Sequence, residues 1–168
     1  MHIGILQTGH VADALIPAHG DYDQIFMTFL AGRGLTFSAY PVVDGVFPDG
    51  ITAADGWLVT GSKHGAYEDH AWIPPLEAFI REAHAAHVPM VGICFGHQII
   101  AQALGGRVEK YSGGWAVGPV DYDVEGFGAL SLNAWHQDQV TELPDDARPI
   151  GTNDFCRYPA LAYGDHIL

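Results

Sequence analysis

The chain has little positive charge. Its 168 residues include seven Lys and Arg against 20 Asp and Glu, which gives a formal net charge of −13. Such an acidic chain repels a phosphate backbone, so we expect no nucleic-acid partner. No apolar run approaches the roughly 20 residues that span a membrane, and the N-terminus lacks the basic and apolar regions of a secretory signal. We therefore expect no membrane partner.

Cysteine is also scarce, because Cys94 and Cys156 are the only two in the chain. We therefore expect no disulfide framework and a reducing, cytoplasmic location. Several of the ten histidines stand near one another in the sequence, but no Cys or carboxylate spacing completes a metal site with them. We expect neither a metal nor a cofactor. The histidines that stand near one another are His64, His70, His84 and His87.

Nearly half of the residues are hydrophobic, which indicates one globular domain over residues 1–168. Strand and helix patterns alternate through the first two thirds, which predicts an open, flavodoxin-like α/β fold with a mainly parallel sheet and helices on both faces. Glycine-separated short strands then predict an antiparallel extension at the sheet's edge. The expected strands are 2–6, 35–43, 56–60, 88–91, 108–111, 116–124, 130–135 and 159–163, and the expected helices are 21–31, one opened by Pro74 and Pro75, and one after Gln98.

The stretch from Gly92 to Gln98, Gly-Ile-Cys-Phe-Gly-His-Gln, joins a predicted strand to a predicted helix. G-x-C-x-G is the thiol counterpart of the G-x-S-x-G nucleophile elbow, in which glycines two residues either side of the nucleophile relieve crowding. Cys94 would then lie at a helix amino end, where free N–H groups favour a thiolate. We interpret Cys94 as a catalytic nucleophile; the alternative is a buried structural cysteine.

A thiolate that attacks a carbonyl makes an oxyanion, which needs two preorganised N–H donors. The backbone N–H of Phe95 is one candidate. Gly61 or Ser62, which follow the predicted strand 56–60, would supply the other, although an ordinary glycine turn would leave the same pattern.

The nucleophile also needs a histidine that carries protons. His97 is too close to Cys94 in sequence and is expected to pack or to form a structural hydrogen bond. His136 follows a predicted strand and precedes an acid, which makes it the best base candidate on local grounds. The alternative is that His136 only shapes a loop.

Together these motifs resemble class I glutamine amidotransferase domains, and in particular free-standing members similar to γ-glutamyl peptidases and GMP-synthase-like glutaminases. The residues that carry the resemblance are Thr60-Gly61-Ser62, Gly92 to Gln98, Ala103 to Gly106, and Ser112 to Trp115 with Gly118. The resemblance implies that Cys94 attacks glutamine or another γ-glutamyl amide to form a thioester. It also implies that Gln98 and His136 lie beside the substrate, with His136 not the catalytic base.

The family's base and orienting acid lie in a His-Pro-Glu segment on a further strand, and no Pro-Glu pair follows any histidine of this chain. His166-Ile167-Leu168 begins like a strand. We therefore expect that the C-terminal strand and the His-Pro-Glu segment are missing from these residues, and that the natural protein continues. Two other hypotheses are a binding module for γ-glutamyl metabolites without catalysis, and a glutaminase subunit that supplies ammonia to a separate synthetase as its partner.

Overall fold

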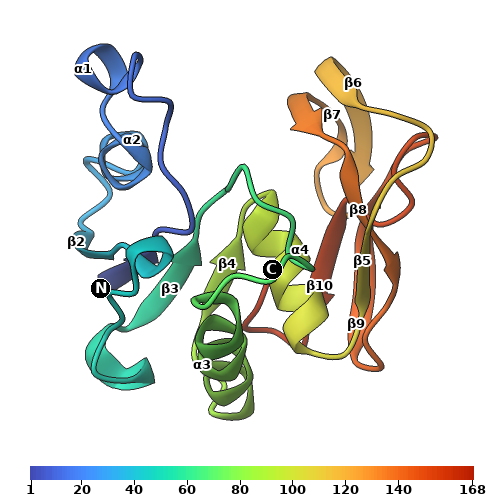
Figure 1. The fold of residues 1–168 in the computed structure, drawn as a ribbon. Coiled ribbons are helices and arrows are strands. Elements are labelled where there is room, and N and C mark those ends of the chain that lie inside the picture. The colour runs from blue at the N-terminus through green and yellow to red at the C-terminus, as the bar shows by residue number, and fades with distance from the viewer.

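Four parallel strands form the sheet that leads into the elbow. A computed structural model describes residues 1–168 (Figure 1). The strands are β1 (His2–Leu6), β2 (Thr36–Tyr40), β3 (Gly56–Val59) and β4 (Met90–Gly92), in the order β2-β1-β3-β4. Every neighbouring pair is parallel, as the alternating pattern predicts.

Two helices cover this sheet and build the core with it. They are α3 (Ile73–Ala85) and α4 (Phe95–Ala103), and α4 packs on both β3 and β4. Leu76, Phe79, Ile80 and Ala83 are buried, as the helical spacing after Pro74 predicts. The longest helix has 13 residues, and no helix combines the length and apolarity that crossing a membrane requires.

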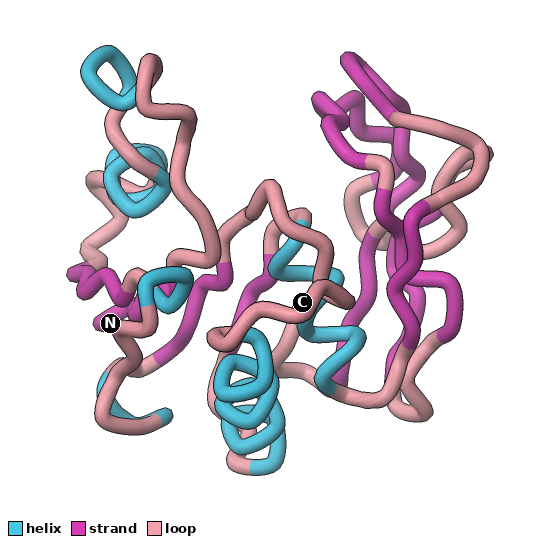
Figure 2. The backbone as a smooth tube through the Cα atoms, viewed as in Figure 1, coloured by secondary structure: helices cyan, strands magenta, loops and turns pink.

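The expected helix at 21–31 forms, but it does not bury the apolar face that its spacing indicates. No residue of α1 (Ile16–His19) or α2 (Tyr22–Phe29) is buried, and Phe29 is 71% exposed. Figures 1 and 2 show α1 and α2 on the side of the molecule where β2 lies, away from α3 and α4. A capping box between Asp21 and Gln24 fixes the start of α2 instead. The short 3-10 helices are η1 (Val42–Asp44) and η2 (Ile51–Ala53).

After α4 the chain contains only strands and loops, which occupy the other side of the molecule (Figure 2). One antiparallel sheet has the order β10-β9-β6-β7, and β5 pairs with β8. The sequence pattern does not predict β8 and β9. The strands are β5 (Arg107–Lys110), β6 (Ala116–Val124), β7 (Gly128–His136), β8 (Asp138–Glu142), β9 (Ala147–Thr152) and β10 (Ala160–Tyr163).

The strand before the elbow is less buried than its apolar sequence predicts. Val91 is 40% exposed and Ile93 is 41% exposed. The reason is position: β4 is the last strand of the parallel sheet, and only a short bridge from Ile167 lies along its outer edge. There Leu168 N–H donates to the Met90 carbonyl at 3.0 Å, and Gly92 N–H donates to the Leu168 carbonyl at 2.8 Å.

Candidate active site

Cys94 occupies the strained turn that the elbow motif predicts. Its φ is 55° and its ψ is −106°, and His87 is the only other non-glycine residue with positive φ. Such a backbone conformation is costly for an L-residue and is typical of functional positions. A Cβ on Gly92 would lie 2.5 Å from the Gly96 carbonyl, and a Cβ on Gly96 would overlap the Val59 carbonyl. Both glycines are therefore required by close backbone approach.

The thiol of Cys94 is solvent-accessible at the mouth of the turn, yet protein atoms surround most of it. Burial raises its pKa, and the Asp138 carboxylate acts in the same direction, while the Phe95 N–H hydrogen bond opposes them. The N–H at the helix amino end thus favours the thiolate, as expected, but burial outweighs its effect on the pKa. No hydrogen bond joins Cys94 to a histidine within residues 1–168.

The Gly61-Ser62 peptide lies next to the nucleophile. A Cβ on Gly61 would be 3.8 Å from Cys94 Cβ. The Gly61 carbonyl lies 3.1 Å from the hydroxyls of both Thr8 and Thr60, and the Thr8 hydroxyl shares its one hydrogen between this carbonyl and the Thr60 carbonyl at 2.9 Å. A trans peptide directs its N–H opposite to its carbonyl, so the Ser62 N–H points away from the two threonines. Neither Gly61 nor Ser62 donates its backbone N–H to another protein atom.

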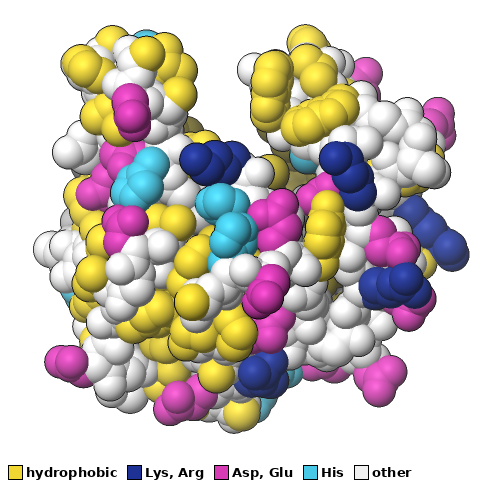
Figure 3. All heavy atoms as spheres, viewed as in Figure 1, with side chains coloured by type: hydrophobic (Ala, Val, Ile, Leu, Met, Phe, Trp, Pro, Cys, Tyr) yellow, Lys and Arg dark blue, Asp and Glu magenta, His cyan; other side chains and the backbone are white.

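Two cavities meet at Cys94. An apolar cavity of about 400 Å³ lies between the outer side of β4 and the antiparallel sheet, lined among others by Val91, Ile93 and Leu161. A polar cavity of about 240 Å³ lies on the side of the loop after β3 and includes Ser62. The space-filling view shows a notch between the two upper lobes of the molecule, with histidine and acidic side chains gathered below it (Figure 3). Both cavities also touch Gln98, Trp135, His136 and Asp138.

The structure brings Gln98 and His136 to one backbone group. Gln98 Nε2 donates to the Asp138 carbonyl at 2.9 Å, and His136 Nδ1 lies 3.2 Å from the same oxygen. Both side chains line the cavities at Cys94. One amide hydrogen of Gln98 is nevertheless used in its bond to Asp138, which joins α4 to β8.

His97 has the structural role that its sequence position predicts. Its Nε2 lies 3.0 Å from the Tyr158 carbonyl, and the residue is largely buried at the wall of the apolar cavity. Burial lowers the pKa of His97 to about 4, so the ring is neutral near pH 7. A neutral Nε2–H donor to a carbonyl leaves this histidine unsuited to carry the Cys94 proton.

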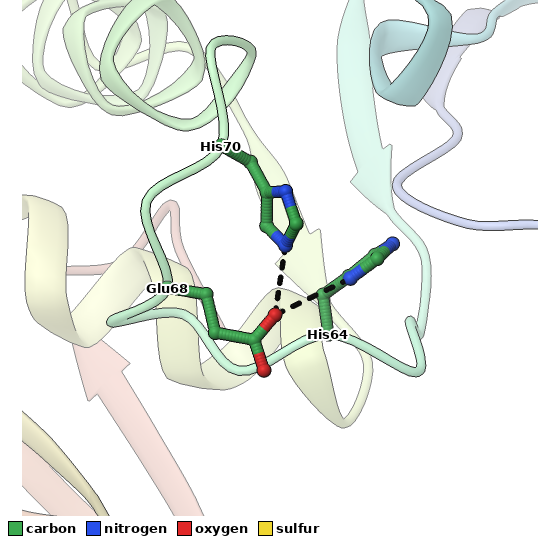
Figure 4. Close-up of side chains that lie close together, drawn as sticks. All are labelled: His64, Glu68 and His70. Carbon is green, nitrogen blue, oxygen red and sulfur yellow. Dashed lines mark hydrogen bonds and ion pairs between the residues drawn. The ribbon is translucent and has the colours of Figure 1, made fainter.

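The expectation that no carboxylate completes a histidine cluster is wrong for two groups, of which one lies beside Cys94. Glu68 Oε2 lies 2.7 Å from His70 Nε2 and 3.3 Å from His64 Nδ1 (Figure 4). The three residues stand on the loop between β3 and α3, and His64 and Glu68 line the polar cavity. The spacing His64-x3-Glu68-x-His70 was visible in the sequence, but only the folding of this loop brings the three side chains together.

The fold and the elbow define an α/β protein with a cysteine at a strand-to-helix turn, and comparison with known proteins gives the family. Residues 52–165 match the family model described as glutamine amidotransferase class-I. The chain belongs to that family.

Among its relatives, gamma-glutamyl peptidase 4 of Arabidopsis thaliana is 32% identical over 165 residues, which cover 89% of this chain and 66% of the relative. A glutamine-hydrolyzing GMP synthase subunit of Halobacterium salinarum is 28% identical, over 92% of this chain and 82% of the relative. A glutamine amido transferase from Methylobacillus flagellatus has a similar structure, with a TM-score of 0.80 and 26% identity, covering 99% of this chain and 66% of that one. The chain thus spans about two thirds of the length of the γ-glutamyl peptidases that it matches.

Proposed function

We propose that the protein hydrolyses glutamine or another γ-glutamyl amide through a γ-glutamyl thioester on Cys94. One observation carries this proposal. The strained thiol stands next to a peptide whose N–H groups are unused, at the junction of two cavities, in a chain of the glutamine amidotransferase family. An elbow without adjacent free donors would not favour acyl transfer over a structural cysteine.

The reaction has two halves. Cys94 Sγ, as thiolate, attacks the γ-carbonyl carbon; the new S–C bond pushes an electron pair onto the carbonyl oxygen. When that pair returns, the C–N bond breaks and the nitrogen leaves as ammonia, or as an amine, after taking up a proton. Water then attacks the thioester, releases the γ-carboxylate and returns the thiol.

Phe95 and the Gly61-Ser62 peptide would stabilise the oxyanion in both halves. The N–H of Phe95 faces the sulfur. The hydroxyls of Thr8 and Thr60 hold the Gly61 carbonyl away, so the Ser62 N–H is the better second donor, with the Gly61 N–H as the alternative. In this proposal Thr8 is a positioning residue, because it acts through the peptide that it holds.

Proton transfer needs a base, and no hydrogen bond joins Cys94 to a histidine that could act as one. The raised pKa of Cys94 makes this need greater, because the thiol holds its proton more tightly. We propose that a base from outside residues 1–168 enters beside Cys94 along the outer edge of β4. The apolar cavity beside Cys94, with the exposed side chains of Val91 and Ile93 in its wall, supports this placement. His136 is the base candidate inside the chain, and it lines the same cavities.

A second candidate is delivery of ammonia to a separate synthetase. The specific observation in its favour is the match to the GMP synthase subunit of Halobacterium salinarum, of which the chain covers 82%. A glutaminase subunit would release ammonia only when the partner is present, whereas a γ-glutamyl hydrolase would act alone. The third hypothesis, glutamine binding without turnover, requires the same cavity but no thioester.

Covalent labelling separates these functions from a structural role for Cys94. A diazo-ketone analogue of glutamine should alkylate Cys94, and excess glutamine should slow this labelling. Peptide mass spectrometry locates the adduct, and the buried Cys156 serves as the internal control. Labelling that falls on Cys156, or that ignores glutamine and γ-glutamyl peptides alike, would contradict the proposal.

A further inference from the structure

The loop between β3 and α3 holds a cluster with the composition of a metal site. Two imidazole nitrogens and one carboxylate oxygen, from His64, His70 and Glu68, all lie within 4.8 Å of one another. Figure 4 shows the two rings next to each other and the Glu68 carboxylate on one side of them, with Oε2 joined to Nδ1 of His64 and Nε2 of His70. We propose that these three residues bind a divalent transition-metal ion, with Zn²⁺ the ion that fits them best.

The ligand set supports zinc over a harder cation. Two histidines with one glutamate are a recurring zinc set, whereas Ca²⁺ and Mg²⁺ prefer oxygen ligands alone. Zinc bonds of about 2.1 Å in tetrahedral geometry place ligand atoms about 3.4 Å apart. The observed separations from Glu68 Oε2 are 3.3 Å to His64 and 2.7 Å to His70, and all three ligand atoms lie within 4.8 Å of one another, so the side chains must adjust to reach this spacing on binding.

Packing fixes the rings in the orientation that an ion would need. The His70 ring stacks on Trp72 with an interplanar angle of 14°, and the His64 ring meets the same indole at 64°. Trp72 is 8% exposed, so it is a rigid support. The ligands themselves stay accessible, with side-chain exposures of 23% for His64, 43% for Glu68 and 32% for His70.

The site would stand in the wall of the polar cavity. His64 and Glu68 line that cavity together with Ser62 and Cys94, so a bound ion would lie on the substrate side of the loop. It would also hold together a loop whose first residues are Gly61 and Ser62, and His64 N–H already donates to Ser62 Oγ at 3.2 Å. Lys63 lines the same cavity and opposes a cation there, while the net charge of −13 favours one.

A second histidine cluster in the same chain is another candidate metal site. His87, Asp165 and His166 also have ligand atoms within 4.8 Å of one another. His166 Nε2, however, already contacts His84 Nδ1 at 3.2 Å, and the ring is almost fully buried. The other ring nitrogen, Nδ1, has no hydrogen-bond partner and lies 3.6 Å from Oδ1 of the fully exposed Asp165. The loop cluster is favoured because its carboxylate oxygen lies closer to both ring nitrogens, at 2.7 and 3.3 Å, and because it lines a cavity at Cys94.

Direct metal binding tests the proposal independently of catalysis. The protein should carry Cys94→Ser, which removes the accessible thiol and makes the result independent of the proposed hydrolysis. Calorimetric titration with Zn²⁺ should give one site, and Co²⁺ should give the visible absorption of a low-symmetry nitrogen–oxygen site without a thiolate charge-transfer band. A His64→Ala/His70→Ala double variant should bind about 100-fold more weakly or not at all, because it keeps one ligand of three.

Two further variants complete the design. Glu68→Gln should weaken binding while it preserves the size of the side chain, and His87→Ala should leave binding unchanged. Far-ultraviolet circular dichroism and the melting temperature without metal confirm that each variant is folded. The proposal is wrong if the parent protein binds no Zn²⁺, if the double variant binds like the parent, or if His87→Ala abolishes binding.

Discussion

The polar and apolar sides of Cys94 differ in whether residues 1–168 supply the groups that catalysis would need. On the polar side, Thr8 and Thr60 hold the Gly61 carbonyl and leave backbone N–H groups free. On the apolar side, Val91 and Ile93 stand exposed beside a strand edge, and no group accepts the thiol proton. The difference teaches that stabilising the oxyanion and transferring the proton depend on different parts of this fold, so they can be tested separately.

Removal of the nucleophile should have the largest effect. Cys94→Ser should lower hydrolysis of an activated γ-glutamyl ester by about a thousandfold or more, as loss of a catalytic nucleophile does. Cys156→Ser is the matched control, because Cys156 also lines the apolar cavity but is buried. Ester hydrolysis is followed by release of the leaving group, and equal activities in the two variants would remove Cys94 from the mechanism.

Gly96 and Gly61 should differ sharply in how well the fold tolerates their replacement by alanine. A Cβ on Gly96 would overlap the Val59 carbonyl, whereas a Cβ on Gly61 meets only ordinary contacts at 3.8 Å. Gly96→Ala should therefore reduce the free energy of unfolding by about 3 kcal/mol, and Gly61→Ala by less than about 1 kcal/mol. Urea denaturation measures both. A tolerated Gly96→Ala would mean that the elbow is less tightly packed than the structure shows.

Acid should lower the free energy of unfolding through His97, which lines the apolar cavity. The pKa of His97 is about 4 in the folded protein against 6.5 in the unfolded chain, so the unfolded state binds the proton more readily. Its contribution to stability is complete above pH 6.5 and is lost as the pH falls towards 4, by at most about 3 kcal/mol. Urea denaturation at several pH values measures this loss.

His97→Gln is the control for that pH dependence, since glutamine keeps a donor for the Tyr158 carbonyl but does not titrate. The variant should lose less stability between pH 7 and pH 4 than the parent protein. Parallel pH profiles for the two proteins would show that the acid sensitivity arises elsewhere.

The smallest expected effect lies on the polar side. Thr8→Val removes one of the two hydroxyls that hold the Gly61 carbonyl, while the backbone N–H of Thr8 and its bond to Thr60 Oγ1 remain. The acylation rate of Cys94 should fall about tenfold, with KM little changed, because the donor acts on the transition state. Thr8→Ser should restore the rate. A rise in KM alone would assign Thr8 to substrate binding.

The sequence predicted the parallel core well, because strong local signals and tertiary structure agree there. The continuous apolar run in β3 and the helical spacing of Leu76 to Ala83 in α3 leave little choice. The exposed face of α2 and the strands β8 and β9 could not be predicted. Amphipathic spacing does not show whether a partner surface exists, and β9 contains Pro149 within a short, half-exposed strand.

The candidate site was predictable to a similar degree. The elbow around Cys94 and the neighbouring Gly61 follow from motifs, since glycines mark close backbone approach. The raised pKa of Cys94 did not follow, because it depends on how deeply the turn is enclosed and on Asp138, 44 residues further along the chain. Glu68 was missed for the same reason: its partners are set by the path of a loop rather than by periodicity.

Acylation by an activated ester tests the central claim most directly. A γ-glutamyl aryl ester has a leaving group that needs no proton, so it requires the nucleophile and the oxyanion donors but not the base. At a pH high enough to form the thiolate, intact and peptide mass spectrometry should show one γ-glutamyl group on Cys94, removed slowly by water. Failure to acylate Cys94, or acylation of Cys156 instead, would contradict the account.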